Sequence, residues 1–157
     1  MNADKITPSV SGVSAVEIAR DAALAAGEIL LDRFHQSKQV SLKGRGNIVT
    51  DVDMLVEQQI LATLSEQFPA IGLLGEESPG TKPDKGLVWV VDPIDGTRNY
   101  VSGVPFYSVV IGLALDGEPL CGVTYDPVRG EMFHAERGKG AFLNGNKLGV
   151  SEKTLLS

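Results

Sequence analysis

The sequence predicts an α+β domain in which two helices cover one face of a largely antiparallel sheet. Two amphipathic helical patterns come first, at residues 13–34 and 50–68, and most strand patterns follow residue 86. Asp-Gly and Asn-Gly pairs separate the later strands, as they do in hairpins. A chain of 157 residues is long enough for one such domain to bury its core without disulfide or metal staples.

The first predicted helix covers residues 13–34. Its apolar residues recur at helical spacing and are rich in alanine, which predicts close packing against a neighbouring helix or sheet. Ser14 and Glu17 have the spacing of a capping box at its start. The polar residues 1–12 are expected to form a flexible leader rather than a secretory signal, which leaves residues 13–157 as the folded domain.

The segment between the helices is predicted to contain a short strand at residues 39–43 and a Gly-Arg-Gly turn at residues 44–46. The second helix is predicted to run from residue 50 to about residue 68, because Pro69 cannot continue it. Its apolar face is expected to consist of Leu55, Ile60, Leu61 and Leu64.

The predicted sheet begins with a short apolar run at residues 71–75, and a surface loop is expected at residues 78–86. Residues 87–91 form a continuous apolar run that is typical of a buried central strand. Further strands are predicted at residues 107–115, 120–125 and 131–135, with an Asn-Gly turn at residues 144–145.

The charge and cysteine counts exclude several classes of function. The chain has 20 acidic and 14 basic side chains and a formal charge of −6, which argues against binding nucleic acid or an anionic membrane by charge alone. No apolar run approaches the roughly 20 residues that a membrane-spanning helix needs. The single cysteine, Cys121, excludes an internal disulfide and a four-cysteine zinc site, and is most simply explained by a cytoplasmic protein.

Two acidic pairs directly follow apolar runs. They are Glu76 with Glu77, and Asp92 with Asp95. Side chains at strand ends project into clefts, where ligand sites concentrate. Carboxylates converging from two strand ends, together with a backbone carbonyl, would supply the oxygen ligands that Mg²⁺ prefers, so we expect a site for one or two such ions.

The turn after the second apolar run suits a phosphate group. Pro93 stiffens this turn and places the carbonyl of Ile94, while Gly96 permits close approach of the backbone. If Thr97 begins a short helix, the amides of Gly96 and Thr97 point outward and are able to bind a phosphate oxygen.

Each of these motifs alone has a simpler explanation. Asp-Pro-x-Asp-Gly is good turn chemistry, two glutamates form an ordinary solvated strand end, and Asp53 completes a capping-box-like pattern with Thr50. Their joint occurrence in one small domain favours a metal and phosphate site. No covalent intermediate is required, so His35, His134 and Cys121 are expected in the core or on the surface.

These motifs resemble those of a known family. Residues 89–100, Trp-Val-Val-Asp-Pro-Ile-Asp-Gly-Thr-Arg-Asn-Tyr, resemble the signature of the inositol monophosphatase family of lithium-sensitive, magnesium-dependent phosphatases. Residues 75–78, Gly-Glu-Glu-Ser, resemble the upstream acidic motif, and residues 47–53 resemble the segment before it. The resemblance extends over residues 16–148 and implies the layered αβαβα sugar-phosphatase fold, of which this chain would be the amino-terminal part.

The resemblance also implies a set of metal ligands. Glu76, Asp92 and the carbonyl of Ile94 would bind a first Mg²⁺, and Asp92 with Asp95 would bind a second. Asp95 would also contact the substrate, and Glu77 would ligate a third, looser ion or lie just behind the ligands. The complete family site holds two or three ions.

The catalytic and substrate-binding roles are implied in the same way. Gly96 and Thr97 would receive the phosphate through their backbone amides. Thr97, held by Asp53, would help Glu76 to orient the attacking water. Lys43 matches the family lysine near the outer metal site after a one-residue shift.

The chain departs from the family after residue 100. Family members carry a second half whose Trp-Asp-x-Ala-Ala motif completes the second metal site, and no such motif is present here. We therefore expect an incomplete sequence that is weakly active or inactive alone, because losing one positioned charge stabiliser costs about 10²-fold or more in rate. An uncovered face and sheet edge predict self-association, and the family predicts a homodimer.

The function predicted on this basis is hydrolysis of inositol monophosphate, or of a related sugar or polyol phosphate, by metal-activated water. The alternative substrates within the family are a 3′-phosphoadenosine nucleotide, fructose bisphosphate and histidinol phosphate. An inactive module that binds metal or phosphate, or pairs with another chain, belongs to a different class and predicts Mg²⁺ binding without turnover. The expected partner of the enzyme is a small-molecule phosphate ester, with no nucleic acid and no membrane.

Overall fold

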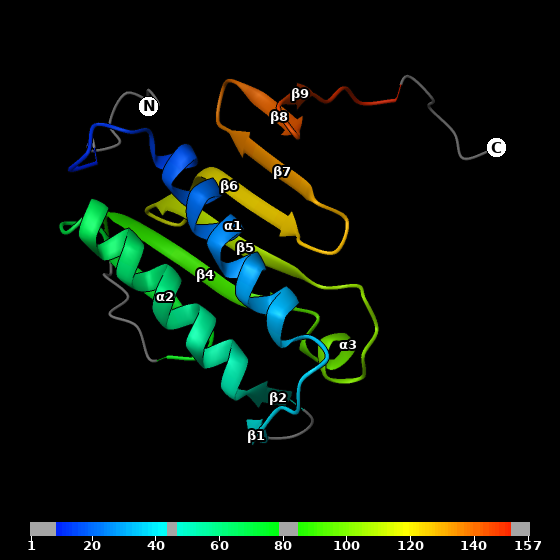
Figure 1. The fold of residues 1–157 in the computed structure, drawn as a ribbon. Coiled ribbons are helices and arrows are strands. Elements are labelled where there is room, and N and C mark those ends of the chain that lie inside the picture. The colour runs from blue at the N-terminus through cyan, green and yellow to red at the C-terminus, as the bar shows by residue number, and fades with distance from the viewer. Residues whose placement is uncertain (1–8, 44–46, 79–84, 152–157) are drawn as a thin grey trace.

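The computed structural model describes residues 9–43, 47–78 and 85–151. Two long helices, α1 and α2, lie side by side across one face of a seven-stranded sheet, as Figure 1 shows. A separate two-stranded sheet lies at the N-terminal end of α2 (Figure 1). The predicted α+β fold is confirmed, and no helix in the described ranges is long and apolar enough to cross a bilayer.

Helix α1 spans Ala15–Arg33 and has the predicted capping box. The Glu17 N–H donates to the Ser14 hydroxyl at 3.4 Å, and the Ser14 N–H donates to the Glu17 carboxylate at 3.3 Å. Gly27 lies against the Tyr125 ring of the sheet so closely that a Cβ atom would collide with it. The small residues of this face therefore let the helix pack tightly on the sheet, as predicted. The buried alanines are Ala15, Ala19, Ala22, Ala23 and Ala26.

Helix α2 spans Asp51–Gln67, with Thr50 as its N-cap. The predicted apolar face was wrong at Leu55, which is 42 % exposed. The buried stripe instead follows i, i+4 spacing from the first turn of the helix, and it carries two acidic side chains among the apolar ones. Its apolar members are Val52, Val56, Ile60 and Leu64, and its acidic members are Asp53 and Glu57.

Residues 9–12, the described part of the predicted leader, are attached to the end of α2. The Val10 N–H donates to the Gln67 carbonyl at 2.9 Å, and the Ser11 hydroxyl donates to the Gln67 side chain at 2.6 Å. Residues 1–8 lie outside the described ranges, so the leader as a whole stays a prediction.

The two-stranded sheet pairs β1, Val40–Lys43, with β2, Asn47–Thr50, in antiparallel register. Strand β1 confirms the prediction for residues 39–43, whereas β2 was not predicted. Four residues that end on a helix N-cap are too few to show a period of two, so β2 carried no separate signal. The predicted turn at residues 44–46 lies outside the described residues.

The large sheet has its strands in chain order, from β3 at one edge to β9 at the other. Strand β3 is parallel to β4, and every other neighbouring pair is antiparallel, which confirms the predicted sheet type. The predicted Asn-Gly turn joins β8 to β9, with φ of 48° at Asn144 and 82° at Gly145. The strands are β3 Gly72–Gly75, β4 Leu87–Asp95, β5 Ser108–Leu115, β6 Glu118–Asp126, β7 Glu131–Glu136, β8 Gly140–Leu143 and β9 Asn146–Lys147.

Strand β4 is longer than predicted, because it continues past Val91 to Asp95. Of the turn predicted at residues 92–97, residues 92–95 are therefore extended backbone, with a register shift against β5 between Asp92 and Asp95. The short helix α3, Thr97–Val101, follows directly. Of the loop predicted at residues 78–86, residues 79–84 lie outside the described ranges.

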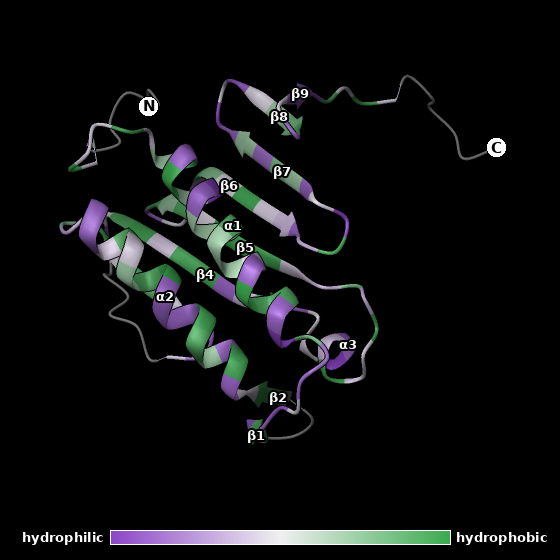
Figure 2. Ribbon diagram, in the orientation of Figure 1, coloured by the Kyte–Doolittle hydropathy of each residue, from purple (hydrophilic) through white to green (hydrophobic). Residues whose placement is uncertain are grey.

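The core lies between the helices and one face of the sheet. Trp89 and Val91 of β4 are buried there, and the Trp89 ring packs 5.5 Å from that of Phe68. Figure 2 draws the central strands β4 and β5 mostly in the hydrophobic colour. Val90, which points to the other face, is 43 % exposed, so the predicted burial of this strand holds for Trp89 and Val91 but not for Val90. The described residues cover only one face of the strand at this position.

Candidate functional site

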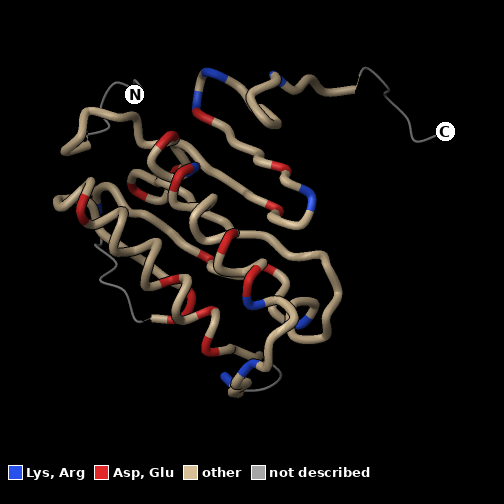
Figure 3. Tube along the Cα trace, viewed as in Figure 1, with Lys and Arg blue, Asp and Glu red and all other residues tan. Residues whose placement is uncertain are grey.

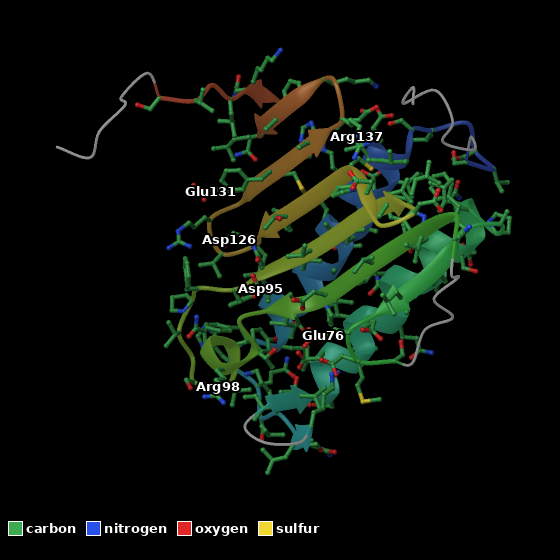
Figure 4. All side chains as sticks on the ribbon, turned by 180° about the vertical axis from the view of Figure 1, so that it is seen from behind. Glu76, Asp95, Arg98, Asp126, Glu131 and Arg137 are labelled. Carbon is green, nitrogen blue, oxygen red and sulfur yellow. The ribbon has the colours of Figure 1, made fainter. Side chains whose placement is uncertain are left out.

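The ends of β3 and β4 bring the predicted acidic residues together. These strands are parallel, with Gly75 paired to Val91, and the Glu76 N–H donates to the Val91 carbonyl at 3.0 Å. Glu76 therefore lies beside Asp92. Figure 4 shows Glu76 and Asp95 at the same end of the sheet, with Arg137 at the opposite end.

The carboxylates at these strand ends repel one another. Burial raises the pKa of Asp92 to about 7, and the negative charge of Glu76, a hydrogen bond with Glu76 and the charge of Asp95 contribute to the same shift. The Ile94 N–H donates to Asp92 Oδ1 at 3.1 Å and opposes the shift. A bound cation would remove the repulsion that raises this pKa.

The donor set fits a hard divalent cation, since every candidate ligand is a carboxylate or carbonyl oxygen. Within the described ranges, no three His, Cys, Asp or Glu side chains are arranged closely enough to hold a metal ion as they stand. Glu76 and Asp95 are exposed, whereas Asp92 is half-buried, so the ligands differ in how far the fold has already fixed them.

Thr97 connects the end of β4 to the start of α2. Its hydroxyl lies 2.9 Å from the Ile94 carbonyl and 3.2 Å from Asp53 Oδ1, and its single proton is shared between these two acceptors. Asp53 is 1 % exposed, and its other oxygen, Oδ2, accepts the Thr50 N–H at 2.8 Å. Burial raises the pKa of Asp53, and the hydrogen bonds from Thr50 and Thr97 oppose this.

Asp53 thus has both of the roles that its sequence position allowed. One carboxylate oxygen completes the capping box of α2, and the other lies at the hydroxyl of Thr97. The helix cap and the site share one side chain, so the start of α2 is fixed relative to the end of β4.

Gly96 is the N-cap of α3 and has a left-handed φ of 97°. A Cβ atom there would lie 3.1 Å from the Phe106 carbonyl, so both conformation and space favour glycine. As a glycine, this N-cap has no side chain to donate or accept a capping hydrogen bond. Asn99, whose amide donates to the same Phe106 carbonyl at 2.8 Å, belongs to the packing of this helix.

Lys43 reaches the site from β1. Its Nζ forms an ion pair with Glu77 and donates to the carbonyl of Glu76 at 3.2 Å. The Glu77 side chain is only 3 % exposed, so a positive charge beside it stabilises the buried carboxylate. Figure 3 shows acidic residues along both helices and basic residues at β1.

Sequence reasoning missed Glu57. This glutamate lies on the buried side of α2, one turn after Asp53, and contacts the turn that carries Glu76 and Glu77. A signal was present: two acidic residues four positions apart fall within the apolar stripe of an otherwise amphipathic helix.

The residues expected to have no catalytic role lie away from the ends of β3 and β4. Cys121 is buried in the core, and burial raises the pKa of its thiol to about 11. His134 stacks on Phe142 with ring centroids 5.0 Å apart, and His35 packs edge-on against Phe34. None of the three lies at the strand ends that carry the acidic residues.

Comparison with known proteins finds relatives among phosphatases. Inositol monophosphatase 1 of Solanum lycopersicum is 42 % identical over 143 residues, which are 88 % of this chain and 52 % of that protein. Histidinol-phosphatase of Chlorobaculum parvum is 42 % identical over 137 residues, covering 87 % of this chain and 53 % of that protein. This chain therefore spans about half the length of the curated relatives it matches.

Solved structures show the same fold. The extragenic suppressor protein suhB of Bartonella henselae superposes with a TM-score of 0.84 at 40 % identity, over 89 % of this chain and 56 % of that one. An inositol monophosphatase of Thermotoga maritima superposes with a TM-score of 0.80 at 32 % identity, over 87 % and 53 %. The model of the inositol monophosphatase family matches residues 13–157, and this chain belongs to that family.

Proposed function

We propose that this chain carries the metal and phosphate site of a Mg²⁺-dependent phosphomonoesterase that hydrolyses inositol monophosphate or a related sugar or polyol phosphate. The observation that carries the proposal is the carboxylate pair Glu76 and Asp92 at adjoining strand ends, where burial and their proximity raise the pKa of Asp92 to about 7. Structural acids are normally paired with basic residues, and this pair instead favours a cation from solution.

Four groups would hold the metal ions. Glu76, Asp92 and the Ile94 carbonyl would bind the first Mg²⁺, and Asp92 with Asp95 would bind the second. When bound, such ions lower the pKa of a water molecule and neutralise the charge on the leaving oxygen. Glu77 is paired with Lys43 in this structure, which supports a place for it behind the ligands rather than among them.

The protein's own groups would orient the reactants. Asp53 accepts from the Thr97 hydroxyl, which leaves the oxygen lone pairs of Thr97 available to a water molecule. Thr97 and Glu76 would hold that water in line with the phosphorus, and the amides of Gly96 and Thr97 would bind a phosphate oxygen.

Histidinol phosphate is a second candidate substrate. The histidinol-phosphatase of Chlorobaculum parvum is as similar to this chain as the tomato inositol monophosphatase is, so the matched half does not separate the two activities. We infer that the selecting residues lie mainly in the half of the relatives that this chain does not cover. The predicted cytoplasmic location and homodimer belong to this proposal, and a binding module without turnover is its alternative.

The test is phosphate release from inositol 1-phosphate and from histidinol phosphate, titrated with Mg²⁺. Asp92→Asn, purified in parallel, controls for contaminating phosphatases. Turnover that rises with Mg²⁺ and is lost in the variant supports the proposal. Mg²⁺ binding without turnover in the wild type favours the binding module, and no Mg²⁺ binding contradicts both.

A further inference from the structure

We propose that Glu57 is a positioning residue: its buried carboxylate fixes the turn after β3, so that Glu76 is held facing Asp92 for metal binding. The consequence for metal binding rests on the proposed function, but the positioning of the turn does not. Glu57 itself is not among the candidate ligands, and it acts through the backbone of its neighbours.

The first observation is the burial of Glu57 and the identity of its partners. Glu57 is 2 % exposed. Its Oε2 accepts the Glu77 N–H at 2.7 Å, and its Oε1 accepts the Ser78 hydroxyl at 2.5 Å. In the part of the chain that the structure describes, the ion pairs do not include Glu57. Removing a carboxylate from water is costly, so donors from one turn that satisfy both oxygens bind that turn to the helix.

The second observation is the space at Gly75, the last residue of β3. A Cβ atom at this position would collide with the carboxyl carbon and both oxygens of Glu57. Gly75 is not among the residues with positive φ, so its conformation does not demand glycine. The glycine is therefore needed to admit the Glu57 carboxylate against the strand end.

These contacts explain why the Gly-Glu-Glu-Ser segment, residues 75–78, begins with glycine and ends with serine. Gly75 makes room for Glu57, and Ser78 donates a hydrogen bond to it. Between them, the Glu76 N–H is held by the Val91 carbonyl, and the next N–H is held by Glu57. The backbone on both sides of Glu76 is thus fixed, although its side chain is exposed.

Fixing this backbone has an energetic consequence. An exposed glutamate on a mobile turn loses conformational freedom when it binds a metal ion, and that loss weakens binding. Groups that orient a ligand typically change metal affinity by about 10- to 100-fold. We expect a loss of that size when the Glu57 carboxylate is removed.

The experiment measures the affinity of the full chain for Mn²⁺, used as a paramagnetic probe of the Mg²⁺ site, at a temperature where all variants are folded. Glu57→Ala is expected to weaken binding by about 10- to 100-fold. Glu57→Gln keeps an oxygen for the Glu77 N–H, and its amide donates to the Ser78 hydroxyl, so it should restore most of the affinity. If removal of negative charge alone weakened binding, Glu57→Gln would be as weak as Glu57→Ala, and the proposal would be wrong.

Two control variants lie on the same helix. Glu66→Gln removes an exposed charge, and Ile60→Val removes a buried methyl group one turn from Glu57. Neither side chain is a candidate ligand or a hydrogen-bond partner of the turn after β3. Both variants should bind Mn²⁺ as the wild type does. An equal loss of affinity in Ile60→Val would show a general effect of destabilisation and would overturn the positioning role.

Amide NMR separates failure of this inference from failure of the proposed function. The Glu77 amide should be slow to exchange in the wild type and in Glu66→Gln, and fast in Glu57→Ala. If the wild type binds no Mn²⁺, the proposed function fails, and the Glu77 amide alone decides whether Glu57 fixes the turn. An unchanged Glu77 amide in Glu57→Ala overturns the inference, whatever the metal affinity.

Discussion

Two segments of this chain have nearly the same sequence and opposite electrostatics: one leads from the end of β4 into α3 and the other joins β6 to β7, and we call them the first and the second turn. Residues 92–96 are Asp-Pro-Ile-Asp-Gly, and residues 126–130 are Asp-Pro-Val-Arg-Gly. In both, the first aspartate accepts a hydrogen bond from the N–H two residues later, at 3.1 Å from Ile94 and at 2.9 Å from Val128. Both closing glycines have positive φ, 97° and 63°. These two shared features therefore do not distinguish the candidate site from the hairpin, although residues 92–95 are extended and residues 127–130 form a turn.

The fourth residue makes the difference. Each first aspartate has an acidic residue on the neighbouring strand, since Glu131 of β7 is paired with Asp126 as Glu76 lies beside Asp92. Arg129 Nη1, however, donates to Asp126 at 2.5 Å, so the hairpin supplies its own positive charge. Asp95 instead adds a further negative charge at the first turn, where burial and the neighbouring carboxylates raise the pKa of Asp92 to about 7. The second turn supplies its own positive charge, whereas the first carries an excess of negative charge that favours a proton or a cation.

The largest expected effect is that of Asp95→Arg, which gives the first turn the charge pattern of the second. The new guanidinium would neutralise Asp92, and Mn²⁺ affinity should fall by about 100-fold or more. The converse change, Arg129→Asp, places a third acid beside Asp126 and Glu131 and should add a weak Mn²⁺ site. Calorimetric titration measures both, and full binding by Asp95→Arg would place the metal site elsewhere.

A second prediction concerns the pH dependence of stability. The folded pKa of Asp92, about 7, lies above its ordinary value of 3.8, so the folded protein binds this proton more tightly than the unfolded chain. The stabilisation that this proton confers is fully present below about pH 4 and is lost as the pH rises towards 7. The Tm of the metal-free protein should fall over this range, and Asp92→Asn should flatten the fall.

The control for the pH prediction is a variant of the second turn, between β6 and β7. Asp126→Asn removes an aspartate that already has a basic partner, and it should leave the fall in Tm between about pH 4 and 7 in place. Mg²⁺ added at pH 8 should raise the Tm of the wild type but not that of Asp92→Asn. Equal stabilisation of both by Mg²⁺ would contradict a metal site at Asp92.

The fold was largely predictable from the sequence, because its signals are local. The capping box of α1 and the Asn-Gly turn before β9 each depend on residues within one turn of the chain. The predictions failed where a distant element decides the outcome. Whether Val90 is buried depends on what covers the second face of the sheet, and the extension of β4 to Asp95 depends on pairing with β5.

The residues of the candidate site also fall into two groups, those that local sequence signals predicted and those that depend on a distant contact. Glu76, Asp92 and Asp95 follow apolar runs, so their place at strand ends was visible in the sequence. Glu57 was not predicted, because its function depends on a contact between α2 and a turn 20 residues later in the chain. An acidic residue inside an apolar helical stripe is a local sign of such a contact, although it does not identify the partner.

A third prediction compares two glycines, Gly75 at the end of β3 and Gly130 in the second turn. Gly75→Ala should destabilise the protein by about 1–3 kcal/mol, because its methyl group would collide with Glu57. Gly130→Ala meets no atom within 4 Å but has a left-handed φ of 63°, and should cost about 1–2 kcal/mol. Glu57→Ala should relieve the first loss and not the second. Denaturant unfolding of the single and double variants measures this coupling, and additive losses for Gly75 with Glu57 would contradict a steric contact.

The smallest expected effect is that of Arg129→Ala. Arg129 pairs with Asp126 and lies 5.2 Å from the Phe106 ring centre, but its side chain is 46 % exposed, so water and salt screen these contacts. The loss in the free energy of unfolding should be about 0.2–1 kcal/mol and should shrink at 1 M salt. Asp126 then lacks its partner and forms a pair of acids with Glu131, one acid fewer than in Arg129→Asp. Mn²⁺ titration should therefore detect no additional site, whereas a new site at residues 126–130 would show that loss of the arginine alone turns such a hairpin into a metal site.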